Sequence, residues 1–510
     1  MCNTMRICAA LLSGTFTLAI FSGLISDVPS RTVHAASPIS DSVSVAASYP
    51  ETVEKILTGW DSYSEVVELG DDQISLNDFR DLFSELTSLH GEYFFVESTY
   101  YATYTAEGYM HAVKFSYANT EAEMNEKRSA YERKINEIIR EVSPAWTEEE
   151  TALYLHDYLA THVAYDETYS RYTAYDALID GTAVCQGYAL AYHDLLEAAG
   201  ITSYTVTSDA LNHIWNLVTI GDSEYYVDVT WDDPTADFIG RCKHNCFLLT
   251  AEELYANSHS SSDWILYGID VKDVNESTQF SDGFWKDAIG QICPLHDQWV
   301  MLTNNTTSAD VTIVDYSRSA VQNKVIYSFS EIWYLWDSTL SYWTGYFSGI
   351  GVYDGFIYLN DRDEIFSIDS NGKNRMKERT LNASESKSGY YYGFYLDPDG
   401  TLTYAIAQDP NSGSVGTTFQ VKTRAVDCDP YETGDVNGDC VINTSDAVLV
   451  LKDYSARMLN TPTTLSEEAI LAGDIDGDGI LTSTDAVWIL KYYSQALISD
   501  SVTWDEIYKP

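Results

Sequence analysis

Hydrophobic residues recur at two spacings along the first part of the chain. In residues 51–89 they recur every three or four positions, which predicts helix. In residues 92–117 they alternate with polar residues and include many aromatic side chains, which predicts strands. We therefore expect a mixed α/β N-terminal region over residues 51–146.

The pattern continues with helices and then returns to strands. Helical spacing covers residues 120–142, and Pro144 is expected to end that helix. It also covers residues 147–162, where Thr147 is a candidate N-cap. A further helix is expected over residues 182–200, followed by short strands between residues 204 and 230. Helices followed by a sheet predict an α+β domain.

Residues 268–427 lose the helical spacing. Short aromatic runs alternate there with Asp-Gly and Asn-Gly turns, which predicts an all-β domain, either propeller-like or a sandwich. The aromatic runs leave polysaccharide contact open, although aromatic strands usually belong to a core.

The N-terminal segment has the pattern of a secretory signal. Arg6 precedes an uncharged apolar run from Ile7 to Ile25, and small residues follow around Ala35. We predict a signal peptide over residues 1–35 and a flexible leader over 36–50; an uncleaved anchor is the alternative. No later stretch is apolar enough to span a membrane, so we expect a secreted chain.

Charge and composition narrow the choice of partners. The net charge is −48, which would repel a phosphate backbone, so we do not expect a nucleic-acid partner. The abundant carboxylates instead offer oxygen ligands for hard cations such as calcium.

One motif occurs twice near the C-terminus, as GDVNGDCVINTSDAVLVLKDYS from Gly434 and GDIDGDGILTSTDAVWILKYYS from Gly473. Oxygen-bearing side chains fall at loop positions 1, 3, 5, 9 and 12, with a backbone carbonyl at position 7, which is calcium-loop spacing. The expected ligands of the two Ca²⁺ ions are Asp435, Asn437, Asp439, Val441, Asn443 and Asp446, and then Asp474, Asp476, Asp478, Ile480, Thr482 and Asp485. Position 6 is Cys440 in the first loop, where glycine favours the turn, so we expect a weaker first site.

This repeat resembles the type I dockerin family over residues 434–498. The resemblance implies a small all-α calcium-binding module that binds a cohesin module of a scaffold protein. It also implies an extracellular complex of the cellulosome type found in anaerobic bacteria. The residues that the family would use to contact cohesin are Thr444, Ser445, Ser483 and Thr484.

A second candidate site combines a cysteine, a histidine and an aspartate. Cys185 lies where a helix is expected to begin, a place that favours the reactive thiolate. His213 and Asp228 lie on either side of the turn at Gly221, so a hairpin would bring them together. Each residue alone could be structural, and Cys242 and Cys246 with His244 between them lack a clear zinc spacing.

Together these motifs resemble the transglutaminase-like superfamily over residues 147–267. The resemblance implies a papain-like α+β core in which Cys185 is the nucleophile, His213 the general base and Asp228 its orienting carboxylate. Amine transfer, deamidation and proteolysis of a protein or peptide substrate all remain open. The alternative is a non-catalytic cellulosome component that binds peptide or polysaccharide.

Overall fold

The structure is a computed structural model. It describes residues 3–8, 44–70, 74–234, 239–257, 259–304, 308–317, 320–330, 333, 347–408, 417–421, 431–438, 442–459, 461–462, 465–496 and 502–507. Most of the predicted signal peptide and its cleavage region therefore lie outside the described residues. The chain forms two compact units, one of residues 1–141, 148–233 and 244–283, the other of residues 142–147, 234–243 and 284–510. The six-part division expected from the sequence stays a prediction.

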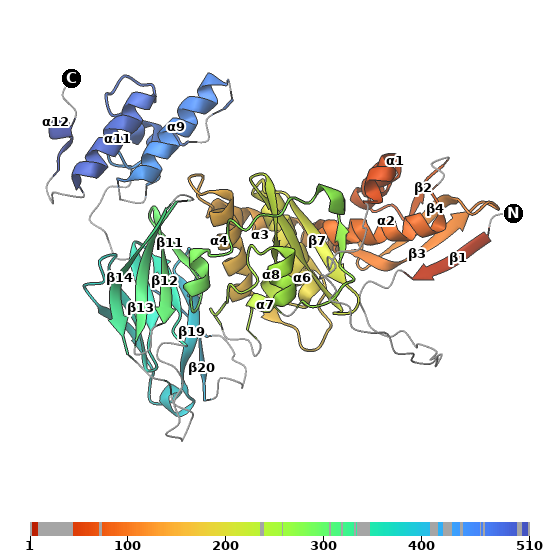
Figure 1. Ribbon diagram of the computed structural model, residues 1–510, viewed down its shortest axis with the longest axis horizontal. Helices are drawn as coiled ribbons and strands as arrows, with labels where there is room; N and C mark the ends of the chain where they lie inside the picture. The colour runs from red at the N-terminus through yellow and green to blue at the C-terminus, as the bar shows by residue number, and fades with distance from the viewer. Residues whose placement is uncertain are drawn as a thin grey trace, which may run out of the picture. The chain divides into compact units, whose positions relative to one another are not determined.

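The first unit begins with a mixed α/β region, which was expected over residues 51–146, but its sheet also includes the strand Asn3–Cys8 from the predicted signal peptide. Its elements are β1 (Asn3–Cys8), α1 (Pro50–Asp61), β2 (Val66–Glu68), α2 (Leu76–Leu89), β3 (Val96–Tyr104) and β4 (Met110–Tyr117). The strands form an antiparallel sheet in the order β1-β3-β4-β2, labelled in Figure 1.

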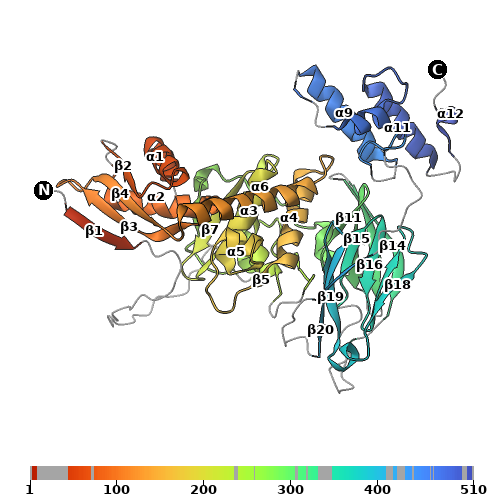
Figure 2. The ribbon, with the colours of Figure 1, turned by 180° about the vertical axis from the view of Figure 1, so that it is seen from behind.

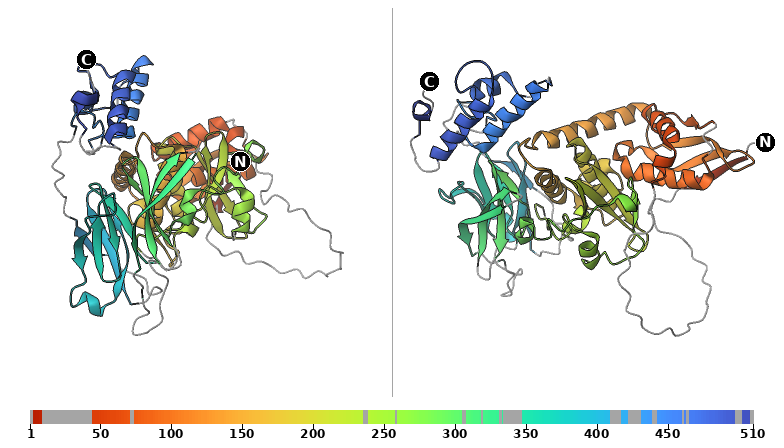
Figure 3. Two further views of the ribbon diagram at one scale, coloured as in Figure 1. Left: turned by 60° about the vertical axis from the view of Figure 1, so that its left-hand side comes forward. Right: turned by 45° about the horizontal axis from the view of Figure 1, so that its top comes forward.

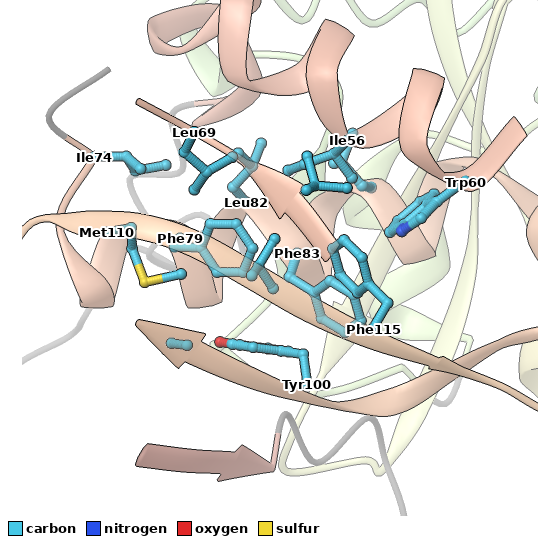
Figure 4. Packing of buried hydrophobic residues seen from close by; sticks show 14 residues of the cluster. Ile56, Trp60, Leu69, Ile74, Phe79, Leu82, Phe83, Tyr100, Met110 and Phe115 are labelled. Atoms are coloured by element: carbon cyan, nitrogen blue, oxygen red, sulfur yellow. The ribbon is translucent and has the colours of Figure 1, made fainter. Parts of the chain in front are cut away.

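An aromatic core fills the space between this sheet and the helices α1 and α2. Phe83 packs on Tyr100 with ring centroids 4.9 Å apart, and Trp60 meets Phe115 edge-on at 5.6 Å (Figure 4). Such tilted and edge-to-face contacts are the favoured aromatic geometries, so these helices and the sheet form one packed layer pair.

The rest of the first unit is an α+β core. Its elements are α3 (Glu121–Arg140), α4 (Glu148–His162), β5 (Ala164–Tyr165), α5 (Ala174–Leu178), β6 (Thr182–Ala183), α6 (Cys185–Ala198), β7 (Ser203–Ser208), β8 (His213–Ile220), β9 (Ser223–Val227), α7 (Val229–Asp232), α8 (Ala251–Ala256) and β10 (Ile265–Tyr267). Strands β10-β7-β8-β9 form an antiparallel sheet, and β5 pairs with β6 in parallel.

Helix α6 is the centre of this core. It packs against α4, α5, β7 and β8, and the long helix α3 lies across α5 and α6 (Figure 2). The Tyr192 hydroxyl donates to the Ala152 carbonyl of α4 at 2.9 Å, and the Asn216 amide of β8 donates to the Ala189 carbonyl at 2.9 Å. These buried bonds fix α6 against its neighbours on two sides.

The structure corrects two local expectations in this unit. Residues 51–89 are not continuous helix, because β2 interrupts them and pairs with β4 at the edge of the sheet. Asp228 was expected on a strand, but β9 ends at Val227. The Asp228 side chain instead accepts the Trp231 backbone N–H at 3.2 Å and caps α7.

The second unit contains three antiparallel meanders. They are β11 (Cys293–Leu295), β12 (Gln298–Asn304), β13 (Ala309–Ser317) and β14 (Ala320–Phe329); β15 (Ile350–Tyr353), β16 (Phe356–Asn360), β17 (Glu364–Ile368) and β18 (Met376–Thr380); and β19 (Tyr390–Leu396), β20 (Thr401–Ala407) and β21 (Thr417–Gln420). Asp354 and Gly355 link β15 to β16 with positive φ at both positions, the hairpin turn that Asp-Gly favours. Several antiparallel sheets are confirmed, but within the described residues no sheet closes on itself, so a propeller is not confirmed.

The C-terminal part of this unit is helical, as expected. It contains α9 (Thr444–Met458), α10 (Glu467–Gly473), α11 (Ser483–Ala496) and the short α12 (Trp504–Ile507). Helices α9 and α11 pack side by side around a shared apolar core, with Val450 and Ile489 fully buried (Figure 3). Helix α10 lies directly before the second loop. Short 3-10 helices elsewhere in the chain cover Ala46–Ser48, Gly91–Tyr93, Val271–Asp273, Phe284–Asp287 and Glu385–Lys387.

Candidate active site and calcium loops

The elements of the α+β core bring the three predicted residues together. Cys185 is the first residue of α6, and the extended Val184 precedes it. His213 begins β8, and Asp228 directly follows β9. The two-residue connection from Ile220 to Ser223 sets the register that brings His213 and Asp228 to the same end of the hairpin.

The imidazole of His213 lies between the other two side chains. Its Nε2 is 2.6 Å from Oδ2 of Asp228, and the Cys185 thiol is close enough to the ring to help raise the pKa of His213. Since Nε2 is engaged by Asp228, Nδ1 is the nitrogen left for the thiol. The order thiol, imidazole, carboxylate is that of a nucleophile, a base and an orienting group.

Burial sets the electrostatics of this triad. Burial alone would lower the pKa of His213, but the charge of Asp228 and its hydrogen bond, with the contact to Cys185, outweigh it and raise the pKa to about 10. Burial acts to raise the pKa of Asp228, yet His213 and a second histidine hold it well below its usual range. The arrangement therefore favours an ionised carboxylate beside a protonated imidazole.

The second histidine on this carboxylate is His259, which the sequence did not single out. Its Nε2 lies 2.7 Å from Oδ2 of Asp228, and its ring packs 4.0 Å from that of Trp231. Asp228 thus interacts with two imidazoles and also caps α7. His259 follows Asp228 by 31 positions, with no motif linking the two. Only the fold reveals the contact.

A second buried network lies at the other end of α7. Nδ1 of His156 and Nε2 of His244 each lie 2.8 Å from Oδ1 of Asp157, and Nε2 of His156 lies 3.3 Å from Oδ2 of Asp232. Asp232 also accepts the backbone N–H of Cys246 at 3.0 Å. All four side chains of the network are buried, so His244 belongs to this hydrogen-bonded group.

Helix α7 joins the two polar groups. It is only four residues long, its cap is Asp228 and its last residue is Asp232. A carboxylate that is buried and hydrogen-bonded has little freedom to move. The His156 network therefore fixes one end of the helix whose other end carries the candidate catalytic aspartate.

The second calcium loop brings its acidic residues together. Carboxylate oxygens of Asp474, Asp476 and Asp485 lie within 4.8 Å of one another. Desolvation and the neighbouring carboxylates Asp485, Asp478 and Asp474 raise the pKa of Asp476. Carboxylates gathered in this way repel one another unless a cation lies among them, so the donor set fits calcium.

The loop backbone supports this arrangement. The buried Asp485 accepts the backbone N–H groups of Ile475 at 3.0 Å and Thr482 at 2.8 Å, which folds the loop back on itself. Ser483 and Thr484 open α11 directly after it.

The first loop has the same frame. The buried Asp446 accepts the N–H of Val436 at 2.7 Å and that of Asn443 at 2.8 Å. Gly438 donates its N–H to Asp435 at 2.8 Å, and Thr444 and Ser445 open α9. The expected ligands Asp439 and Val441, together with Cys440, lie outside the described residues.

Comparisons with known proteins match both regions. The model of the transglutaminase-like superfamily matches residues 136–231, and that of the dockerin type I domain matches residues 433–493. The chain carries a transglutaminase-like domain and a type I dockerin. The two matched segments are short, so they classify these regions and leave the activity of the whole chain open.

The other comparisons add little. No curated protein matches the chain. Among solved structures, a crystal structure of a "Putative Cysteine Protease" from Cytophaga hutchinsonii is similar at 16% identity, over 28% of this chain and 47% of that one, with a TM-score of 0.18. The match spans less than half of that structure, and a likeness this weak carries no argument about activity.

None of the helices in the described ranges combines the length and apolar character needed to cross a bilayer.

The His156 network predicts a pH dependence of stability. Burial acts to lower the pKa of His156, but Asp157 and Asp232 raise it to about 9, above its ordinary value of 6.5. The stability from this charge is therefore fully present below about pH 6.5 and is lost as the pH rises through about 9. In denaturant unfolding followed by tryptophan fluorescence, we expect the advantage of the native chain over His156→Gln to be largest at pH 6 and to shrink by pH 9.5. A constant difference over this range would contradict a charged His156.

The second loop predicts loss of one calcium site in a single variant. Asp485→Asn removes a buried negative charge at loop position 12, so we expect calcium affinity at that site to fall at least about tenfold. Isothermal calorimetry of the full chain should then detect one tight site fewer. Glu468→Gln, an exposed change on α10, is the matched control and should leave binding unchanged. Unaltered calcium binding by the Asp485 variant would remove this loop from the ligand set.

Proposed function

We propose that the chain is a secreted cysteine-dependent acyl-transfer enzyme acting on protein amides and attached to a cohesin-bearing scaffold by its dockerin. The observation that carries the catalytic part is the position of His213. Its ring makes a hydrogen bond with Asp228 at 2.6 Å, and Cys185 is among the groups that raise its pKa. In this arrangement the thiol proton moves to the imidazole and the imidazolium is stabilised by the carboxylate.

The reaction then proceeds in two halves. The Cys185 thiolate adds to the carbonyl carbon of an amide, and His213 gives its proton to the nitrogen that leaves, so the acyl group remains as a thioester. A second amine that attacks the thioester forms a new amide and restores the thiol. Water in its place forms a carboxylate, which is deamidation of a glutamine or hydrolysis of a peptide bond.

The helix start supports the nucleophile. Cys185 is the first residue of α6, so its sulfur lies near backbone N–H groups that have no acceptor within the helix. The positive end of the helix dipole favours a thiolate there. The same N–H groups are suited to the oxyanion that forms when the carbonyl is attacked.

The attachment rests on the dockerin. Calcium in the two loops would hold the start of α9 and of α11, where Thr444, Ser445, Ser483 and Thr484 are the proposed cohesin contacts. Large apolar side chains are exposed on this module, among them Met458, Leu459 and Leu471. Large apolar side chains exposed on a small domain are candidates for a partner surface. The predicted signal peptide agrees with an extracellular scaffold.

Selective reactivity of Cys185 tests the catalytic proposal. Treated briefly with iodoacetamide near pH 7, the protein should carry the label at Cys185 well before its other cysteines, as read by peptide mass spectrometry. His213→Ala should slow this labelling at least about tenfold, because the thiol loses its base. Equal labelling of all cysteines would point to an inert thiol and to the non-catalytic binding module.

The type of reaction needs a second measurement. Mixed protein substrates are incubated with the protein, calcium and a labelled primary amine, beside a Cys185→Ala control. Label joined to glutamine identifies a transferase, a mass gain of one unit at glutamine a deamidase, and new chain ends a peptidase. No change that depends on Cys185 would count against all three.

A further inference from the structure

A pocket of about 290 Å³ lies in the first unit, between the N-terminal α/β region and the transglutaminase-like core. The first region supplies Trp60, His90, Gly91, Tyr93, Phe94 and Val96, and the core supplies Tyr172, Gln186 and Leu190. The volume is near the lower end of the range for small-molecule sites, so the pocket is suited to one large side chain.

The pocket extends to the first turn of α6, which begins at the candidate nucleophile. Gln186 and Leu190 lie one turn apart on α6, and Gln186 directly follows Cys185. Near this end of α6, burial first and the charge of Cys185 next raise the pKa of Tyr165 to about 12. In a peptide substrate bound at Cys185, a residue next to the attacked amide can therefore place its side chain in the pocket.

Aromatic contacts hold the wall in place. Trp60 is fully buried, with its ring 5.2 Å from Tyr93 and 6.0 Å from Phe83 in the core of Figure 4. Phe94 packs on Tyr175 at 4.8 Å and on Tyr131 at 5.5 Å. A pocket whose walls are already packed needs little reordering when it binds.

The lining is aromatic, aliphatic and neutral polar. No Lys, Arg, Asp or Glu is among the described residues that line it, and His90 is already paired with Glu92 at 3.1 Å. A charged side chain placed there would lose its hydration without gaining a partner, whereas a large apolar one would be buried favourably.

We propose that this pocket binds a bulky apolar side chain of a peptide substrate, such as Phe or Leu, close to the amide that Cys185 attacks. The proposal rests on the proposed function and adds the substrate class. The specificity of the enzyme is then determined by the N-terminal region together with the core.

Peptidyl chloromethyl ketones test the pocket directly on the full chain. The Cys185 thiolate displaces chloride from such a probe and forms a thioether, so the rate of labelling reports how well the peptide is positioned. Probes are compared that differ only at one of the three residues before the ketone, with Phe, Leu, Gly or Asp there. At the position that enters the pocket, we expect probes with Phe or Leu to label Cys185 at least about tenfold faster than probes with Gly or Asp.

Ser98→Phe is the informative variant. Ser98 is exposed on β3 and lines the pocket, so the larger ring should occupy part of it and reduce the preference for Phe and Leu to about that for Gly. The rate with iodoacetamide, which needs no pocket, should stay unchanged and shows that the variant is folded. Glu97→Phe, at the neighbouring exposed position outside the lining, is the matched control and should leave both rates unchanged.

The outcomes separate the two proposals. If iodoacetamide labels Cys185 selectively but the peptide probes react equally, or if Ser98→Phe leaves their order unaltered, the pocket proposal is overturned and the catalytic one stands. If iodoacetamide shows no selectivity for Cys185, the catalytic proposal fails, and the pocket proposal fails with it.

Discussion

The candidate site depends on one buried carboxylate. Asp228 is almost fully enclosed, and an ionised carboxylate without partners in such a place would cost several kcal/mol. It has two imidazoles on one oxygen and a helix N–H on the other, so its charge is compensated from both sides. The hydrogen bond to this carboxylate orients the imidazole of His213, and the imidazole in turn faces the Cys185 thiol.

The same carboxylate connects the chemistry to the stability of the core. Because Asp228 caps α7, the helix can start only where the site is formed, and Asp232 at its other end is held by His156 and by backbone groups. Because α7 has only four residues, a displacement of one end also moves the other end. Polar groups that lie outside the triad thus contribute to its geometry.

The sequence predicted that Cys185, His213 and Asp228 lie together because they stand in compact motifs, and their catalytic roles stay a prediction. Cys185 stands at a recognisable helix start, and the short turn at Gly221 confines His213 and Asp228 to one hairpin. His259 and the His156 network could not be predicted, because each contact joins residues far apart in the chain and no periodic pattern marks it. Asp228 was expected on a strand because the alternation of side chains continues past Val227. The strand ends there because the aspartate side chain caps α7. The strand β2 could not be predicted, because three residues are too few to show an alternating pattern within a segment of helical spacing.

The dockerin could be predicted from the sequence, since a duplicated spacing is a property of the sequence itself, whereas the individual calcium ligands stay a prediction. The β-rich region was predicted only as a class, because its aromatic runs identify strands but not which strands pair.

The boundaries of the family match have a practical consequence for anyone who isolates the catalytic core. Residues 136–231 contain Cys185, His213 and Asp228 but exclude His244 and His259 as well as the whole aromatic wall around Trp60. A fragment cut at those limits would lose the contact of His259 with Asp228 and would expose one face of α6 to water. It would retain the three named residues but lose part of the structure that orients them.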